Sequence, residues 1–320
     1  MGLPTLPKDL SFENQSILIT GSNTGIGLEF ARVFLRRKAK AVYLVVRSLE
    51  RGNNAVSKLQ QDAVISKENP TAEIKVYQCD QSSFESTLSF AKKFKEEVKS
   101  LNTVVLNAGV NNMVFVPSVD GWESNFQINY FGAAFIALEL LPLLKEGQKS
   151  GVKSHLFFTS SLMHTKASIS TTSLVAEDVN VLEYFAAKEN RPWDPSQPYS
   201  ISKLLLTMFA EELAKHETDI ISTSGCPGIV LTELDRNLPI WLKGPVILMK
   251  SLIGREVFTS AETLMHAMIT DKTGTYWSDG VVKPHASVMN TENGKTVQKK
   301  LYEQTLQKCK ELDPNIYLPA

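Results

Sequence analysis

The stretch Thr20-Gly21-Ser22-Asn23-Thr24-Gly25-Ile26-Gly27 directly follows the apolar run Ile17-Leu18-Ile19 and precedes an amphipathic stretch that extends from Leu28 to about residue 37. A strand, a glycine turn and a helix in this order present backbone N–H groups and the positive end of a helix to a pyrophosphate. The three glycines allow, in order, the tight turn, the approach of the phosphate and the close packing of helix on strand. Because the spacing differs from G-x-G-x-x-G, a glycine-rich turn that binds no ligand stays open as the alternative.

Strand-like and helical stretches alternate along the rest of the chain, which predicts βαβ units and a parallel sheet covered on both faces. We therefore predict an α/β fold with a single doubly wound (Rossmann) sheet. A last strand is expected in residues 276–282, and a C-terminal helical tail at about 286–320. The expected strands are residues 16–20, 41–46, 74–79, 103–107, 154–159 and 220–226, and the expected helices are residues 25–37, 49–66, 84–99, 121–144 and 197–215.

The composition excludes several classes of protein. The chain has 320 residues, of which 43% are apolar and 21% are charged, and its net charge is zero. No linker divides it, so we expect one domain over residues 1–320, and scattered Lys and Arg leave no footprint for nucleic acid. Residues 1–14 lack an apolar signal segment, no stretch reaches 18 apolar residues, and three cysteines without a Cys-x-x-Cys fit a reducing compartment. We expect a cytoplasmic protein, and no metal, because the five histidines lack metal-ligand spacing.

Tyr199 and Lys203 are four residues apart in a stretch with a helical pattern, so both side chains lie on one helix face, about one turn apart. A nearby ammonium favours the phenolate and turns a tyrosine into a usable general acid or base. The pattern occurs by chance in long helices, and its other interpretation is a core-edge aromatic residue beside a solvated cation.

Taken together, T-G-x-x-x-G-I-G near the N-terminus, Asn107-Ala108-Gly109, a serine and Tyr-x-x-x-Lys resemble the short-chain dehydrogenase/reductase family. The resemblance covers roughly residues 14–285, with all motifs in order. It implies a Rossmann fold that binds a nicotinamide cofactor. It also implies four catalytic residues, Asn129, Ser161, Tyr199 and Lys203, with Ser160 as the alternative to Ser161. Asn129, whose other interpretation is a polar residue on a helix face, would bend its helix and hold a water molecule against Lys203.

The second strand of the sheet ends at Val46-Arg47, where the family usually has an acidic residue that binds the ribose of NAD. Because the forked donors of an arginine suit a 2′-phosphate, we expect NADP(H) and a supporting contact from Arg51. Arg47 as a polar residue that ends a strand, and Asp80 as a helix cap, are the alternatives. The residues expected to contact the cofactor are Gly21, Asn23, Thr24, Gly25, Ile26, Gly27, Arg47, Arg51, Asp80, Gln81, Asn107, Ala108, Gly109, Tyr199, Lys203, Pro227, Gly228, Val230 and Thr232.

The substrate is expected to be a bulky hydrophobic ketone or aldehyde, or the corresponding alcohol. Ser161 and Tyr199 are 38 residues apart, an unusually long gap for this family, and the apolar residues between them are expected to wall the pocket. A second apolar insertion gives a lid at about residues 233–256, for which contact with a membrane surface stays open. These features resemble the retinol-dehydrogenase-like branch and fungal biosynthetic and sterol ketone reductases. The sequence leaves monomer and homodimer open, and also an NADP(H)-binding sensor or interaction protein without efficient turnover.

Overall fold

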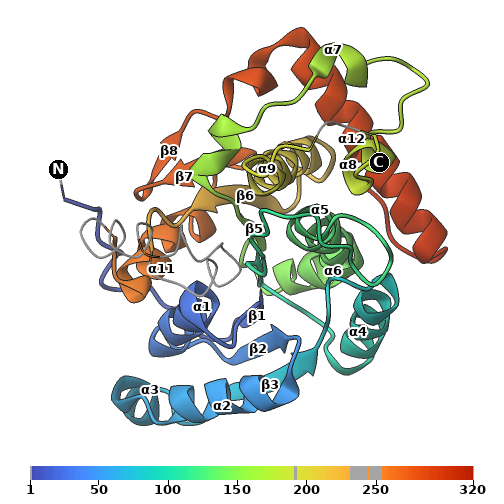
Figure 1. Cartoon of the computed structure of the whole chain (residues 1–320). Coiled ribbons are helices and arrows are strands. Elements are labelled where there is room, and N and C mark those ends of the chain that lie inside the picture. Colours follow the sequence, from blue (N-terminus) through green and yellow to red (C-terminus); the bar gives the residue numbers. More distant parts are fainter. Residues whose placement is uncertain (1, 191–192, 231–243, 245–253, 320) are drawn as a thin grey trace.

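The computed structural model describes residues 2–190, 193–230, 244 and 254–319. Within them, eight strands form one sheet in the order β3-β2-β1-β4-β5-β6-β7-β8 (Figure 1). All neighbouring strands are parallel except β7 and β8, which form an antiparallel hairpin. The doubly wound sheet predicted from the sequence is therefore confirmed. The strands are β1 Ser16–Thr20, β2 Ala41–Val46, β3 Glu73–Gln78, β4 Thr103–Leu106, β5 His155–Thr159, β6 Ile221–Cys226, β7 Thr275–Ser278 and β8 Val281–Lys283.

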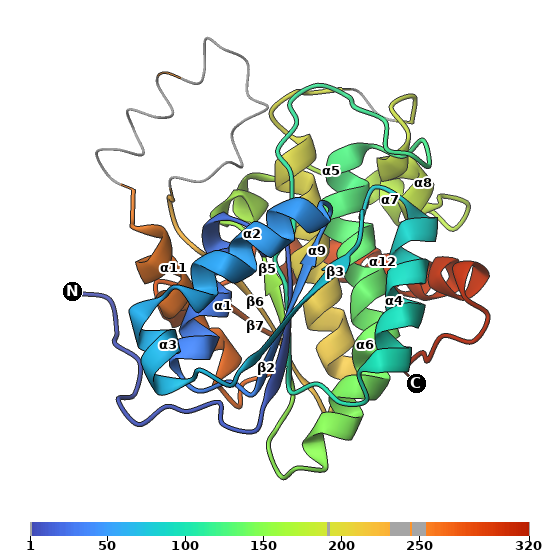
Figure 2. The same cartoon turned by 90° about the horizontal axis from the view of Figure 1, so that it is seen from below.

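Helices cover both faces of the sheet, as Figure 2 shows with the strands seen between two layers. One face carries α1 Gly25–Arg36, α2 Leu49–Gln60, α3 Ala63–Glu68 and α11 Val257–Met265. The other face carries α4 Phe84–Glu97, α6 Gly132–Gln148, α9 Pro198–His216 and, outside them, α12 Glu292–Leu312. Each face has its own apolar core, because strands buried on both sides send alternate side chains to opposite layers.

The long helical stretch Ser124–Gln148 begins as α5 Ser124–Phe126, passes through a π-helical turn at Gln127–Phe131 and continues as α6. Its length and hydropathy would suit a membrane span, but 89% of its most apolar window is buried inside the protein. It is therefore the central helix of one core layer. A π-helical turn places one extra residue in a helix, and such turns are common at functional sites.

Two of the expected elements were wrong in detail. The single helix predicted over residues 49–66 is broken at Asp62, whose carboxylate caps α3 and binds Arg32 and Arg36 of α1. Salt bridges between distant elements fix this break, and periodicity does not reveal them. The single strand predicted over residues 276–282 is the β7–β8 hairpin, which turns at Asp279 and Gly280, both with positive φ.

The segment between β5 and α9 was expected to wall the substrate pocket, and this is largely wrong. Its short helices, α7 Thr171–Leu174 and α8 Val181–Ala186, pack against α12 (Figure 1). Their apolar side chains belong to the core, and Gln304 of α12 accepts a hydrogen bond of 2.7 Å from the backbone N–H of Val181. The segment therefore has its partner in the C-terminal helical tail. Most of the expected lid, residues 233–256, lies outside the described residues.

Candidate active site

A cleft of about 540 Å³ opens at the carboxyl ends of the central strands. It lies where the strand order reverses, between β1 and β4, which is the place where open α/β sheets bind ligands. The cleft brings together most of the residues that the sequence assigned to the cofactor. These lining residues are Gly21, Asn23, Thr24, Gly25, Ile26, Arg47, Arg51, Asp80, Gln81, Asn107, Ala108, Gly109, Tyr199, Lys203 and Pro227.

The glycine turn has the geometry of a phosphate cradle. Gly21 and Gly25 have φ of +64° and +57°, which L side chains rarely adopt. A Cβ at Gly27 would lie 2.4 Å from the carbonyl oxygen of Gly21, so the expected packing role of Gly27 is confirmed. Helix α1 begins at Gly25 without a side-chain cap and without an acidic residue in its first turn. Its first N–H groups and its positive end are thus available to an anion.

Thr20 holds this turn against the end of β4, a role that the sequence analysis missed. Its buried hydroxyl oxygen accepts hydrogen bonds from the N–H groups of Asn107 (2.9 Å) and Ala108 (3.0 Å). The side chain of Asn107 completes the bracket by donating to the carbonyl oxygens of Thr20 and Gly21. The signal in the sequence was a hydroxyl residue directly after the aliphatic run Ile17-Leu18-Ile19.

At the end of β2, Arg47 and Arg51 line the cleft and are exposed, and Glu50 lies beside them. Ser48 caps α2 by accepting a hydrogen bond from the N–H of Arg51. Two cations and one carboxylate therefore line this end of the cleft. Sequence reasoning overlooked Glu50, although it opens α2, where acidic residues are favoured by the helix dipole.

Asp80 and Gln81 lie at the end of β3. The Asp80 carboxylate accepts hydrogen bonds from the N–H (3.0 Å) and hydroxyl (2.7 Å) of Ser82. Asp80 does not cap α4, because that cap is Ser83, so the alternative considered for Asp80 is wrong. The buried Gln81 amide donates a hydrogen bond to the carbonyl oxygen of Ile128. This bond joins the cleft to the π-helical turn that precedes α6.

Tyr199 and Lys203 lie one turn apart near the start of α9 and line the same cleft. The Lys203 Nζ lies 5.8 Å from the centre of the Tyr199 ring and donates a hydrogen bond of 2.7 Å to the carbonyl oxygen of Thr159. Lys203 is 3% exposed, and burial lowers its pKa to about 8. A lysine of this kind changes protonation state near neutral pH, which suits a group that supports proton transfer.

Asn129 lies in the middle of the π-helical turn and is fully buried. Its Oδ1 accepts a hydrogen bond of 2.7 Å from the N–H of Val110, and its amide nitrogen donates to the Val110 carbonyl oxygen (2.8 Å) and to the Ser202 hydroxyl (3.0 Å). It therefore joins the π-helical turn, the end of β4 and the helix of Tyr199. Both polar atoms of this buried side chain have partners, as the burial of an amide requires.

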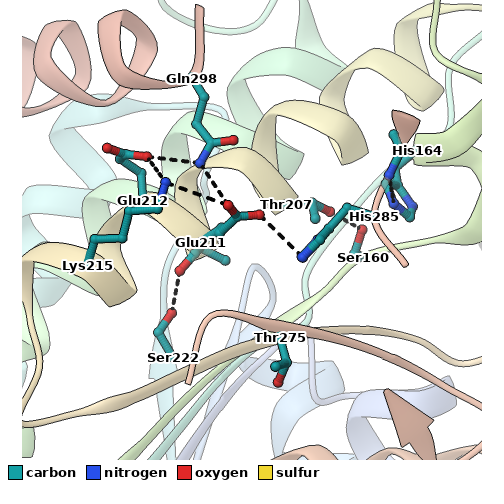
Figure 3. A network of polar contacts seen from close by, with 12 residues as sticks. Ser160, His164, Thr207, Glu211, Glu212, Lys215, Ser222, Thr275, His285 and Gln298 are labelled. Carbon is teal, nitrogen blue, oxygen red and sulfur yellow. Dashed lines mark hydrogen bonds and ion pairs between the residues drawn. The ribbon is translucent and has the colours of Figure 1, made fainter. Parts of the chain in front are cut away.

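Ser160 and Ser161 point in different directions. The Ser160 hydroxyl is buried and bonded to the Thr207 hydroxyl of α9 at 2.7 Å, so it is already engaged although Ser160 lines the cleft; both residues are labelled in Figure 3. The Ser161 side chain is partly exposed and caps a 3₁₀ helix, Leu162–Lys166, by accepting a hydrogen bond from the N–H of Met163 (3.2 Å). This leaves the hydroxyl proton of Ser161 free to be donated, so the geometry favours Ser161 over Ser160.

The segment after β6 is described as far as Val230. Pro227 lines the cleft, and Gly228 has a φ of +80°. A Cβ there would lie 3.2 Å from the guanidinium of Arg255, which forms an ion pair with Asp279 in the β7–β8 turn. Val230 is buried and forms a parallel β-bridge with Arg255. Thr232 lies outside the described residues.

Among the residues whose structure is described, no three His, Cys, Asp or Glu side chains form a group that would hold a metal ion.

Comparisons with known proteins identify the family of the chain and agree with its fold. The short chain dehydrogenase family model matches residues 15–176. A short chain dehydrogenase of the fungus Arthrobotrys oligospora is 44% identical over 98% of this chain and 97% of its own length. The short chain dehydrogenase sor7 of Hypocrea jecorina, also a fungus, is 31% identical over 89% of this chain and 80% of its own length.

Solved structures share the same fold. The RhlG/NADP complex of Pseudomonas aeruginosa superposes with a TM-score of 0.60 and 20% identity, over 85% of this chain and 96% of that one. The chain thus belongs to the short chain dehydrogenase family of oxidoreductases, as its sequence motifs indicated, and is similar to fungal members of it.

Proposed function

We propose that this protein is an NADP(H)-dependent reductase of bulky, hydrophobic ketones or aldehydes, which also oxidises the corresponding alcohols. One observation carries the proposal: Tyr199 and the buried Lys203 share a cleft with the glycine turn of α1, and Ser161 follows directly on Thr159 and Ser160, which also line that cleft. A binding site for a dinucleotide is thereby joined to a proton donor and a hydrogen-bond donor.

The residues that are present fit a dinucleotide phosphate. The pyrophosphate would lie on the uncapped N-terminus of α1 and the glycine turn, where a Cβ at Gly21 would come within 2.8 Å of Ala108. Arg47 and Arg51 would bind the 2′-phosphate of the ribose, with Val46 in the place where an acidic side chain would select NAD. The RhlG structure contains NADP, which supports the same choice in a protein of the same fold.

When bound, the reduced nicotinamide supplies a hydride, which is two electrons and a proton, to the carbonyl carbon of the substrate. The Ser161 hydroxyl donates a hydrogen bond to the carbonyl oxygen as its negative charge develops. Tyr199 gives its phenolic proton to that oxygen, so the alcohol leaves with one hydride and one proton added. Lys203 stabilises the phenolate that remains, until a proton from solvent restores Tyr199.

The apolar substrate class is supported by partly exposed apolar side chains in the segments that carry Ser161, Gly228 and Tyr199. Leu162 (59% exposed) and Met163 (42% exposed) directly follow Ser161, and Ile229 (39% exposed) follows Gly228. Phe115, from the loop between β4 and α5, packs edge-to-face on Trp193, which precedes α9, at a ring distance of 5.6 Å. An apolar ligand would cover this surface, which otherwise faces water.

Turnover tests the proposal. Purified protein with NADPH and a panel of apolar carbonyls, decanal among them, should show oxidation of NADPH and formation of the matching alcohol. Binding of NADPH without oxidation by any carbonyl in the panel would instead support a protein that senses or only binds the cofactor. A matched assay with NADH measures the cofactor preference.

A further inference from the structure

His164 is a buried histidine that the reaction described above does not use. It lies three residues after Ser161, in the 3₁₀ helix that Ser161 caps, and it is fully buried. Its ring contacts the ring of Tyr276 in β7, with the ring centres 4.4 Å apart. Figure 3 labels it together with Ser160, Thr207 and His285.

Both ring nitrogens of His164 are bonded to the backbone. Nδ1 lies 2.7 Å from the carbonyl oxygen of Ser161, and Nε2 lies 3.1 Å from the backbone nitrogen of Ala286. A backbone N–H can only donate, so Nε2 must accept the bond from Ala286. A neutral imidazole has one N–H, which must therefore be on Nδ1 and must donate to Ser161.

The environment keeps this ring neutral. Burial lowers the pKa of His164 below its ordinary value, and the nearby His285 acts in the same direction. A proton added at Nε2 would face the N–H of Ala286 and remove that hydrogen bond. The neutral ring with its proton on Nδ1 is thus the form that both contacts require.

The Ser161 carbonyl oxygen accepts two hydrogen bonds from the same residue, one from the backbone N–H of His164 (3.0 Å) and one from its ring. The Ser161 side chain, in turn, accepts the N–H of Met163. The turn that sets the direction of the Ser161 hydroxyl is therefore held in place through His164 by the backbone N–H of Ala286, more than a hundred residues away in the chain.

We propose that His164 is a positioning residue that holds Ser161 in the orientation needed to donate its hydrogen bond to the substrate oxygen. This inference rests on the function proposed above. It assigns His164 no proton transfer and no contact with the substrate. His164 affects the reaction only through the orientation of Ser161. An effect on kcat through Ser161 can therefore be distinguished from an effect of His164 on stability.

Two substitutions remove the two hydrogen bonds of the ring one at a time. In His164→Asn, an amide N–H takes the place of Nδ1–H, so the bond to Ser161 is kept and the bond to Ala286 is lost. In His164→Gln, the amide oxygen takes the place of Nε2, so the bond to Ala286 is kept and the bond to Ser161 is lost. Because a loss of alignment at a reacting group is costly, kcat with decanal should fall roughly tenfold to hundredfold in the Gln variant and stay close to wild type in the Asn variant. KM for NADPH should not change in either variant.

Combining His164→Gln with Ser161→Ala gives the decisive measurement. If His164 acts through Ser161, the double variant should have the kcat of Ser161→Ala alone. An equal loss of kcat from His164→Gln in the presence and the absence of the Ser161 hydroxyl would overturn the proposal, as would equal losses in the Gln and Asn variants. Thermal melts of all variants measure the structural contribution separately.

If the Gln variant does not fold, NMR of His164 in the wild-type protein tests the proposal instead. The Nδ1–H proton of His164 should be visible by NMR and should shift when decanol binds to the NADPH complex, which cannot react. The shift should disappear in Ser161→Ala, and its absence in the wild type would overturn the proposal. If wild-type protein oxidises no NADPH with any carbonyl, the proposed function fails instead, and the kinetic comparison does not apply.

Discussion

The ammonium of Lys203 donates a hydrogen bond of 2.7 Å to the carbonyl oxygen of Thr159, the last residue of β5. This bond joins α9, which carries Tyr199, to the strand end that continues into Ser161, so it links the elements of the proposed proton donor and the proposed hydrogen-bond donor. Among the described residues Lys203 has no carboxylate partner, although its side chain is buried. The protein therefore accepts a buried charge at this position, which is costly to stability.

This cost predicts a pH-dependent effect of Lys203→Met on stability. Burial lowers the pKa of Lys203 in the folded protein to about 8, against 10.5 for an ordinary lysine. Between these values the unfolded chain binds the extra proton, so the wild-type free energy of unfolding gains a contribution as pH rises from about 8 to about 10.5. Below pH 8 the wild type bears the full cost, on the order of 3 kcal/mol.

The stability of Lys203→Met relative to wild type should thus be greatest below pH 8 and should decline by about that amount towards pH 10.5. Urea unfolding of both cofactor-free proteins at several pH values measures the difference. The exposed Lys58, substituted by Met, is the control and should show no such trend. A pH-independent difference between Lys203→Met and wild type would contradict the lowered pKa.

Tyr199→Phe should lower kcat at least roughly 100-fold, because the variant loses the proton donor but keeps the aromatic ring. NADPH should still bind, since the glycine turn and Lys203 are unchanged. Steady-state kinetics with decanal and fluorescence titration with NADPH measure the two effects. Near-normal turnover in the variant would mean that another group protonates the substrate oxygen.

Val46→Asp combined with Arg47→Ala should shift the cofactor preference from NADPH towards NADH. The pair replaces a cation for the 2′-phosphate by a carboxylate for the ribose hydroxyls, and the loss of charge-assisted bonds is worth roughly 1–3 kcal/mol. KM values for both cofactors before and after the change decide the matter. A wild type that already prefers NADH would contradict the assignment of Arg47 to the 2′-phosphate and would make Glu50, which lines the same end of the cleft, the next residue to substitute.

The sequence predicted the sheet and many of the residues that line the cleft, because both depend on local patterns. A glycine turn after a strand, and a Tyr and a Lys four residues apart on a helix, have nearly the same geometry wherever they occur. The break at Asp62 and the bracket formed by Thr20 depend on partners far away in the chain, Arg36 in one case and Asn107 in the other. Periodicity has no information about such contacts.

The segment between β5 and α9 shows the same limit. Its apolar residues were correctly recognised as buried, but a hydrophobic pattern does not say which surface covers it. Leu174 and Phe185 belong to the apolar core that also contains side chains of α12, whereas Trp193 packs on Phe115 in the loop between β4 and α5. Trp241, the aromatic residue of the expected lid, lies outside the described residues.

Trp193 is therefore expected to contribute to the recognition of large apolar substrates. Its ring packs edge-to-face on Phe115, and the loop of Phe115 is fixed at its base by the bond from the N–H of Asn112 to Asn125 (2.8 Å). Loss of the ring should remove apolar contact from a large substrate and leave a small one unaffected. Trp193→Ala should raise KM for decanal roughly tenfold, equivalent to about 1.4 kcal/mol, with little change in KM for propanal or NADPH.

Trp277→Ala is the matched control for this prediction. Trp277 is partly buried in β7, on the face opposite Tyr276, and its indole N–H donates to Thr275. It should lower the melting temperature without altering the ratio of the two KM values. If Trp193→Ala behaves in the same way, lowering stability while the preference for decanal over propanal stays at the wild-type value, then the Phe115–Trp193 pair only joins two loops. The bulk of the substrate would in that case be recognised by other residues around Ser161.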